Sequence, residues 1–159
     1  MENNKDGILL ETGTNEIEIM EFTIDGNLYG INVAKVREIM MSAPVKPMPH
    51  THQAVEGIFK PRDTVITVVD LPKYLTGREH EHKEKDLFIV TNFNQMHVAF
   101  RVETVVGISR ISWKDIQKPD STISGGADGV ATGIAQCGEN LVNILDFERI
   151  VAEIAPETS

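Results

Sequence analysis

The chain has 159 residues, of which 41% are hydrophobic and 25% are charged, and these proportions are typical of one globular domain with a sizeable apolar core. Its formal net charge of −9 argues against binding to nucleic acid or anionic lipid, because both need clustered lysine and arginine. A single cysteine, an acidic N-terminus and the lack of an apolar run near the roughly 20 residues of a membrane helix together predict a cytoplasmic protein without direct membrane insertion.

Residues 1–15 lack a sustained hydrophobic period and are expected to form an N-terminal tail. From Ile17 onward, apolar residues recur mostly at every second position, which predicts a strand, and the break between Ile19 and Met20 predicts a β-bulge. The dipeptide Asp25-Gly26 predicts a hairpin turn. The returning strand is indicated by three alternating apolar residues, Tyr29, Ile31 and Val33.

The next segments give one predicted helix and one predicted buried strand. Apolar residues at helical spacing indicate a short helix, and they are Val33, Val36, Ile39 and Met40. The proline-bearing stretch of residues 44–49 must end that helix. Residues 64–69 are β-branched at every position, so we expect a strand that is covered on both faces.

The rest of the chain is predicted to be mostly strand. A hairpin is expected from residues 87–93 and 96–102, with further strands at residues 105–111, 130–137 and 141–145. A glycine-bearing loop is expected over residues 121–129. The chain is predicted to end in a helix that Asp146 caps and whose apolar stripe comprises Phe147, Ile150, Val151 and Ile154.

A weak internal repeat runs through these elements. The pattern Val33-x-x-Val36-x-x-Ile39 matches Val102-x-x-Val105-x-x-Ile108. The dipeptide Gly57-Ile58 is followed by Asp70 at the same distance as Gly133-Ile134 is followed by Asp146. The shared order of these features favours two similar small β-units that cover each other's apolar faces.

Residues suited to chemistry are few. The spacing of His50 with His52, and of His80 with His82, would place two rings on one side of a strand, as a metal site needs, yet both pairs lie in polar loops where solvated histidines are expected. We therefore predict no catalytic residue, no cofactor and no metal. The alternative is a small β-barrel metal-dependent enzyme, or a metal-binding domain, that uses the histidine pairs with Asp63 or Asp120.

The segment Lys60-Pro61-Arg62-Asp63 separates two apolar stretches. Proline presets the backbone for a turn, so Arg62 is expected to point into solvent at a rim of the molecule. A solvated hairpin tip and a side chain that contacts a partner are both consistent with this arrangement.

The order of several motifs resembles the CheW family of chemotaxis coupling proteins over about residues 16–155. The motifs are Tyr29-Gly30-Ile31-Asn32-Val33, Val36-Arg37-Glu38-Ile39, Gly57-Ile58-Phe59, Arg62, residues 65–71, Gly133-Ile134 and residues 141–146. Residues 8–16 and Pro61-Arg62-Asp63 are most similar to the CheV branch, in which such a domain is fused to a phosphorylatable receiver domain. The family usually has glycine where Asp63 stands.

The resemblance implies a mainly β fold of two intertwined five-stranded SH3-like barrels with short helices over residues 16–155. Residues 156–159 would be a C-terminal tail or the start of a linker, and the chain either a piece of a CheV-like protein or a stand-alone coupler. The resemblance also implies a non-enzymatic adaptor that binds the histidine kinase CheA and the cytoplasmic tips of methyl-accepting chemoreceptors. The implied partner-binding residues are Val36, Glu38, Gly57 and Arg62.

Overall fold

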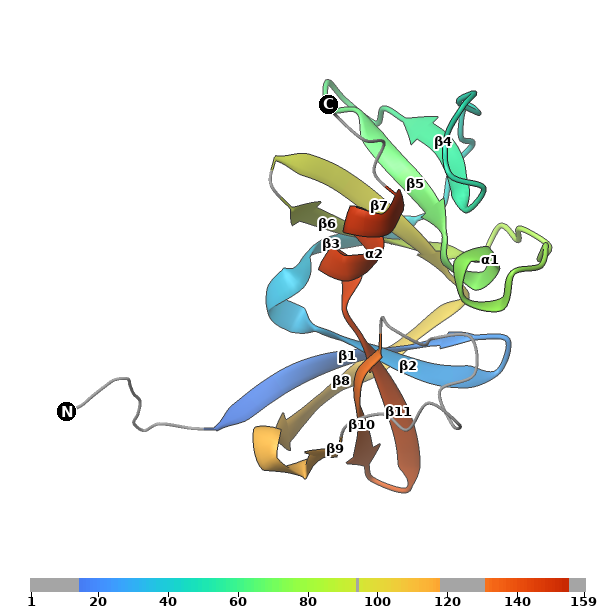
Figure 1. The fold of residues 1–159 in the computed structure, drawn as a ribbon. Helices are drawn as coiled ribbons and strands as arrows, with labels where there is room; N and C mark the ends of the chain where they lie inside the picture. The colour runs from blue at the N-terminus through green and yellow to red at the C-terminus, as the bar shows by residue number, and fades with distance from the viewer. Residues whose placement is uncertain (1–14, 94, 118–130, 155–159) are drawn as a thin grey trace.

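Strands dominate the computed structural model, which describes residues 15–93, 95–117 and 131–154 (Figure 1). The first sheet contains, in spatial order, β8 (Thr104–Ser112), β1 (Glu16–Ile24), β2 (Asn27–Asn32), β11 (Asn140–Leu145), β10 (Ala131–Cys137) and β9 (Ile116–Gln117). The second contains β3 (Val36–Met41), β6 (Leu87–Phe93), β7 (Met96–Val102), β5 (Ile66–Asp70) and β4 (Val55–Phe59). The helices are α1 (Leu71–Thr76) and α2 (Phe147–Ile154), with 3₁₀ turns at Val33–Lys35 and Trp113–Asp115. The mainly β fold class is thereby confirmed.

The two halves of the chain are intertwined. The first half places its hairpin β1–β2 in the first sheet and strands β3, β4 and β5 in the second. The second half does the reverse, because hairpin β6–β7 lies in the second sheet whereas β8, β10 and β11 lie in the first. In both sheets, a hairpin strand pairs in parallel with the strand that precedes a helix, as β2 pairs with β11 and β7 pairs with β5. The internal repeat predicted from the sequence is thus present in the topology.

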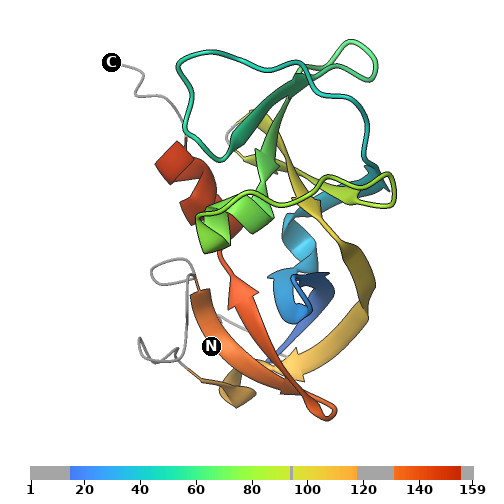
Figure 2. The ribbon, with the colours of Figure 1, turned by 90° about the vertical axis from the view of Figure 1, so that its right-hand side faces the viewer.

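Both helices start at an aspartate, and for α2 this is the Asp146 cap predicted from the sequence. The Asp70 side chain accepts a hydrogen bond from the Lys73 amide at 3.1 Å, and Asp146 accepts one from the Arg149 amide at 3.2 Å. A carboxylate at this position satisfies a free N–H group of the first helical turn. Helices α1 and α2 lie side by side (Figure 2), and the hydroxyl of Tyr74 in α1 donates to Glu153 in α2. None of the helices that the structure describes is long and apolar enough to cross a membrane.

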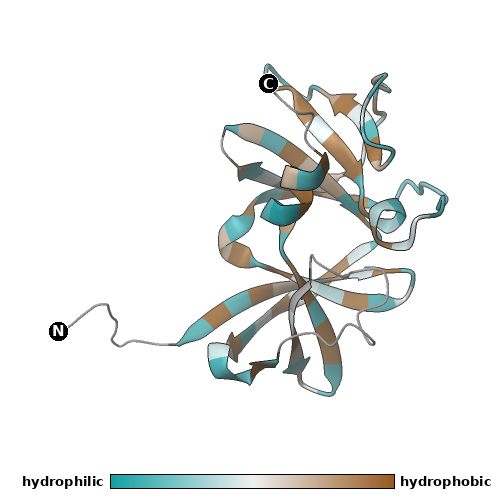
Figure 3. Ribbon diagram, in the orientation of Figure 1, coloured by the Kyte–Doolittle hydropathy of each residue, from teal (hydrophilic) through white to brown (hydrophobic). Residues whose placement is uncertain are grey.

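The largest apolar core lies between the two sheets and includes residues of both helices. Its fully buried large side chains include Phe22, Phe100, Phe147, Ile31, Leu71, Ile89 and Ile150. Smaller clusters on the other sides of the sheets form around Ile19 and Val142 in the first sheet and around Val68 and Phe88 in the second. The alternation that predicted β1 is visible along this strand in Figure 3.

The helix predicted from Val33 to Met40 is wrong over most of its length. Only Val33–Lys35 is helical, and Val36–Met41 forms β3, which pairs with β6 in antiparallel orientation. A register shift between Val36 and Glu38 lets the strand alternate irregularly, so that its apolar residues mimic helical spacing. Pairing with β6 satisfies the backbone of this segment, and that tertiary interaction outweighs its local pattern.

Smaller differences concern boundaries. The bulge predicted between Ile19 and Met20 occurs in the pairing of β1 with β8 between Glu21 and Phe22. The strand predicted over residues 64–69 spans Ile66–Asp70, because backbone pairing with β4 reaches no further than Ile66 and leaves Val65, which is 51% exposed, without a strand partner. The loop predicted over residues 121–129, and the tail over residues 1–15 apart from Asn15, lie outside the described residues.

Candidate partner-binding surface

The four residues implied as partner contacts lie in the second sheet and its loops. Val36 and Glu38 are on β3, at one edge of the sheet, and Gly57 is on β4, at the other edge. Arg62 lies in the loop of residues 60–65 that joins β4 to β5. An isolated antiparallel bridge joins Lys46, in the segment that follows β3, to Ile58 in β4. The chain that leaves β3 at one edge of the sheet therefore pairs with β4 at the other edge.

Strand β3 presents a mixed surface. Val36 is half-buried against the central core and Met40 packs against the smaller core of the second sheet. Glu38 is exposed, and Ile39 and Met41, whose side chains alternate to the opposite face of the strand from Glu38, are 38% and 63% exposed. The strand therefore exposes one carboxylate on one face and two apolar side chains on the other, and each of these groups can contact another protein.

The backbone conformation of Gly57 explains why glycine stands at this position. Its φ of +147° is a conformation that side chains disfavour, and a Cβ atom built there would lie 2.0 Å from the Lys46 carbonyl oxygen. Lys46 and Ile58 exchange two backbone hydrogen bonds of 2.8 and 2.9 Å beside it. Gly57 is buried, so any effect that it has on a partner acts through the path of the segment at Lys46.

Arg62 is exposed, as the turn chemistry predicted, and forms no ion pair with another described residue. The following residue, Asp63, does not have a positive φ, so replacing the glycine usual in the family causes no strain here. The neighbouring Val65 is also exposed. This loop therefore exposes an apolar side chain and a guanidinium group that forms no ion pair with another described residue.

An apolar cleft that the sequence did not reveal lies between the start of β1 and the start of α2. It has a volume of about 230 Å³, and its apolar lining includes Ile17, Ile31, Trp113, Ile116, Ile144 and Phe147. Trp113, the only tryptophan of the chain, is 55% exposed. An ion pair of 2.8 Å between Lys35 and Glu148 flanks the cleft. The one signal in the sequence is the tryptophan, since an exposed Trp often marks an interface.

Among the described residues, neither histidine pair brings both of its rings to one set of metal ligands. The rings of His50 and His52 do not converge on a ligand set: His50 is exposed at a positive φ, and His52 Nδ1 accepts from the Ala54 amide at 3.0 Å. His80 and His82 turn to different carboxylates, of Asp25 and Asp70 respectively. Asp63 lies in the exposed loop beside Arg62, and Asp120 lies outside the described residues.

The chain is similar in sequence to several chemotaxis proteins. The chain is 31% identical over 150 residues to the chemotaxis protein CheV3 of Helicobacter pylori, with 87% of this chain and 48% of that protein covered. It is 27% identical over 139 residues to CheW of Thermotoga maritima, with 87% and 90% covered. The chain thus spans about half the length of CheV3 and most of the length of CheW.

Among solved structures, the scaffolding protein TtCheW of Thermoanaerobacter tengcongensis superposes with a TM-score of 0.75 at 22% identity, covering 82% of this chain and 88% of that one. This likeness establishes the same fold. The family model for the CheW-like domain matches residues 18–155. The chain therefore belongs to the family of CheW-like domains.

Proposed function

We propose that this chain is a non-catalytic adaptor that couples chemoreceptors to the histidine kinase CheA in a receptor array. The observation that carries the proposal is the match to the CheW-like domain over residues 18–155. Relatives that share this domain are named as chemotaxis proteins, CheV3 and CheW among them. An adaptor of this kind needs at least two contact surfaces and no reacting groups.

The surface features support two contacts of different chemistry. Glu38 on β3 and Arg62 in the loop between β4 and β5 provide opposite charges at exposed sites, and Val36 lies half-buried two positions before Glu38. Arginine presents a planar set of five donors that matches carboxylates and carbonyls on a partner. The cleft beside Trp113 is apolar and can accept one or two side chains of a helix. We assign partner binding to Val36, Glu38, Gly57 and Arg62, with Gly57 acting through the backbone that it shapes.

The proposal is tested by reconstitution. CheA and a receptor signalling fragment from the same organism are sedimented with the purified 159-residue chain on receptor-bearing vesicles, with and without each component. We expect CheA to sediment only when the chain is present, and its autophosphorylation to rise in that mixture. If the chain bound neither CheA nor the receptor fragment, the adaptor function would be wrong.

A further inference from the structure

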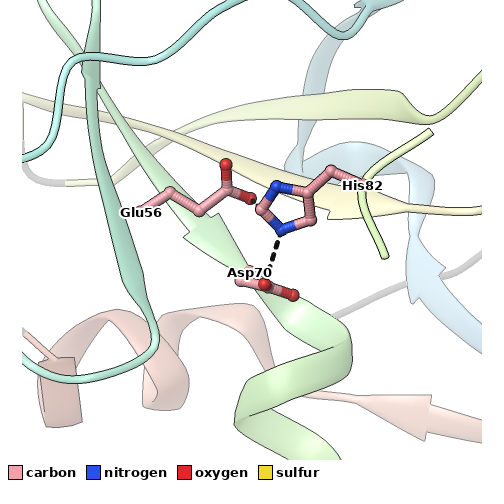
Figure 4. Close-up of side chains that lie close together, drawn as sticks. All are labelled: Glu56, Asp70 and His82. Atoms are coloured by element: carbon pink, nitrogen blue, oxygen red, sulfur yellow. Dashed lines mark hydrogen bonds and ion pairs between the residues drawn. The ribbon is translucent and has the colours of Figure 1, made fainter. Parts of the chain in front are cut away.

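Three side chains from separate elements point toward one another in Figure 4: Glu56 from β4, Asp70 from the end of β5, and His82 from the loop of residues 77–86. The His82 Nε2 atom lies 2.8 Å from Asp70 Oδ2 and 3.7 Å from Glu56 Oε2. One potential ligand atom from each residue lies within 4.8 Å of the other two. We propose that these three residues bind one divalent transition-metal ion of the Zn²⁺ type.

The spacing suits a single ion. Ligand atoms around a tetrahedral ion with bonds of about 2.1 Å lie about 3.4 Å from one another. The separations of 2.8 and 3.7 Å at His82 Nε2 lie on either side of this value, and the Glu56 and Asp70 oxygens lie within 4.8 Å of one another, so binding an ion would need side-chain adjustments on the order of 1 Å. The set of one imidazole and two carboxylates is typical of Zn²⁺ and its neighbours, whereas Mg²⁺ prefers oxygen ligands alone.

Buried charge is the second observation that indicates a cation. The side chains of Asp70 and Glu56 are only 4% and 9% exposed. Within the described residues, Asp70 forms no ion pair with lysine or arginine, and its partners are a backbone amide and the His82 ring. A buried carboxylate without a fixed positive charge beside it is costly, and a bound cation would remove that cost.

The charged side chains around the site also supply too little positive charge. Arg101 contacts both Glu56 and Asp86, so one guanidinium faces two carboxylates while Asp70 stands beside them. Lys73, which is close in sequence, has its ammonium group 2.5 Å from Glu79. Three carboxylates thus share one arginine. A divalent ion would bring the net charge of this group to zero when His82 is neutral.

Each ligand is already held by another group. Arg101 donates to both oxygens of Glu56 at 2.6 and 3.0 Å, and the Lys73 amide donates to Asp70 Oδ1 at 3.1 Å, which leaves Oδ2 facing His82. Such outer contacts orient ligands in metal sites. All three residues line an open cleft of about 670 Å³, so solvent can reach the ion and supply the remaining ligand. The proposed site contains one histidine, and its role is structural. A bound ion would fix the loop of residues 77–86 to β4 and to the start of α1.

The test is a Zn²⁺ titration of the tag-free 159-residue chain in competition with a chromogenic chelator. We expect one ion per chain, and a loss of affinity of more than about 100-fold for His82→Ala, since even outer contacts are worth 10- to 100-fold. Asp70→Asn, which keeps a side chain able to cap α1, should lose affinity with its circular dichroism unchanged. The matched control is His50→Ala, which removes an exposed histidine and should bind like the wild type.

A second measurement excludes binding elsewhere on the surface. Zn²⁺ should raise the thermal unfolding midpoint of the wild type and of His50→Ala but not of His82→Ala, because an ion that binds only the folded site stabilises it. Mg²⁺ in large excess should not displace Zn²⁺. The proposal would be overturned by the absence of Zn²⁺ binding, by equal binding to wild type and His82→Ala, or by displacement with Mg²⁺.

Discussion

The guanidinium group of Arg101 and the carboxylate of Glu56 form a two-point buried ion pair, with Nε 2.6 Å from Oε2 and Nη2 3.0 Å from Oε1. The pair joins β7 to β4, which are not neighbours in the sheet. Burial by itself would lower the pKa of Arg101, but hydrogen bonds and charges from Glu56 and Asp86 outweigh it and raise the pKa. Arg101 also lies over the Phe88 ring, with its Cζ 5.2 Å from the ring centroid.

Removing this arginine should leave buried carboxylates without their cation. We expect Arg101→Leu to lower the free energy of unfolding by about 3–5 kcal/mol, the usual cost of removing one member of a buried pair. Urea unfolding measures the effect. The matched control is Arg110→Leu, because Arg110 pairs with Glu18 at 3.2 Å on the exposed surface and should cost less than about 1 kcal/mol. Equal effects of the two substitutions would contradict the structural role of Arg101.

Much of the fold can be predicted because local residue patterns mark its strands, turns and helix starts. The hairpin at residues 87–102, the Asp25-Gly26 turn and the capped helix at Asp146 all follow from local residue patterns, and the structure contains each of them. Asp25 and Gly26 have φ values of 57° and 80°, as a tight hairpin turn requires. Patterns of this kind indicate structure whenever neighbouring residues alone decide the conformation.

The failures come from interactions between distant segments. The residues of β3 by themselves predict a helix, because they carry no sign of the pairing with β6, about fifty positions away in the chain. The burial of Arg101 could not be predicted from the sequence either, since an arginine on an alternating strand is normally at the surface. The approach of Glu56, Asp70 and His82 depends on the position of a loop, for which the sequence gives no signal.

The strand β5 should be sensitive to truncation on both faces. Val68 and Val69 are both fully buried, and they face different apolar clusters. Replacing either valine with alanine should cost about 1–3 kcal/mol of unfolding free energy through lost burial and the cavity left behind. Chemical denaturation checks this, with Val65→Ala, at a 51% exposed position, as the control that should change little. A variant that folds like the wild type and loses only partner binding would show that its valine belongs to an interface.

Gly57→Ala should destabilise the fold rather than merely weaken binding. The added Cβ would lie 2.0 Å from the Lys46 carbonyl oxygen at a φ of +147°, so the backbone must move. A cost of about 1–3 kcal/mol or more is expected for this strain. The control is Gly107→Ala, since Gly107 has open space around its Cβ position. A stable Gly57→Ala protein that no longer binds its partners would instead place Gly57 in direct contact with them.

The two tyrosines should ionise at unusually high pH. Burial, then the nearby Asp25 charge, raises the pKa of Tyr29, while burial, then the hydrogen bond to Glu153 and its charge, raises the pKa of Tyr74. Tyrosine in an unfolded chain ionises near pH 10. The contribution of Tyr29 and Tyr74 to the free energy of unfolding is therefore complete below about pH 10 and is lost as the pH rises toward their pKa in the folded protein. In a Tyr29→Phe background, Glu153→Gln should lower the pKa of Tyr74 in a spectroscopic tyrosinate titration. An unchanged midpoint would rule out the contribution of Glu153.

The exposed Arg62 provides the direct test of partner contact. Because Arg62 is exposed and forms no ion pair with another described residue, Arg62→Ala should leave the unfolding free energy within about 0.5 kcal/mol of the wild type. Losing a charge-assisted contact should nevertheless weaken binding to CheA or to the receptor fragment by about 1–3 kcal/mol, measured by calorimetry.

Lys60→Ala is the matched control for Arg62, since it removes a positive charge from the same exposed loop without removing the guanidinium group. If Arg62→Ala and Lys60→Ala weakened binding equally, the loop would act through its overall charge, because a specific contact depends on the planar arrangement of the arginine donors. Arg62→Lys distinguishes a charge effect from a specific contact, because it keeps the positive charge. If the guanidinium group makes a two-point contact, this variant should still lose most of the affinity. Unchanged binding of Arg62→Ala to both partners would make Arg62 an ordinary solvated side chain at the tip of the loop.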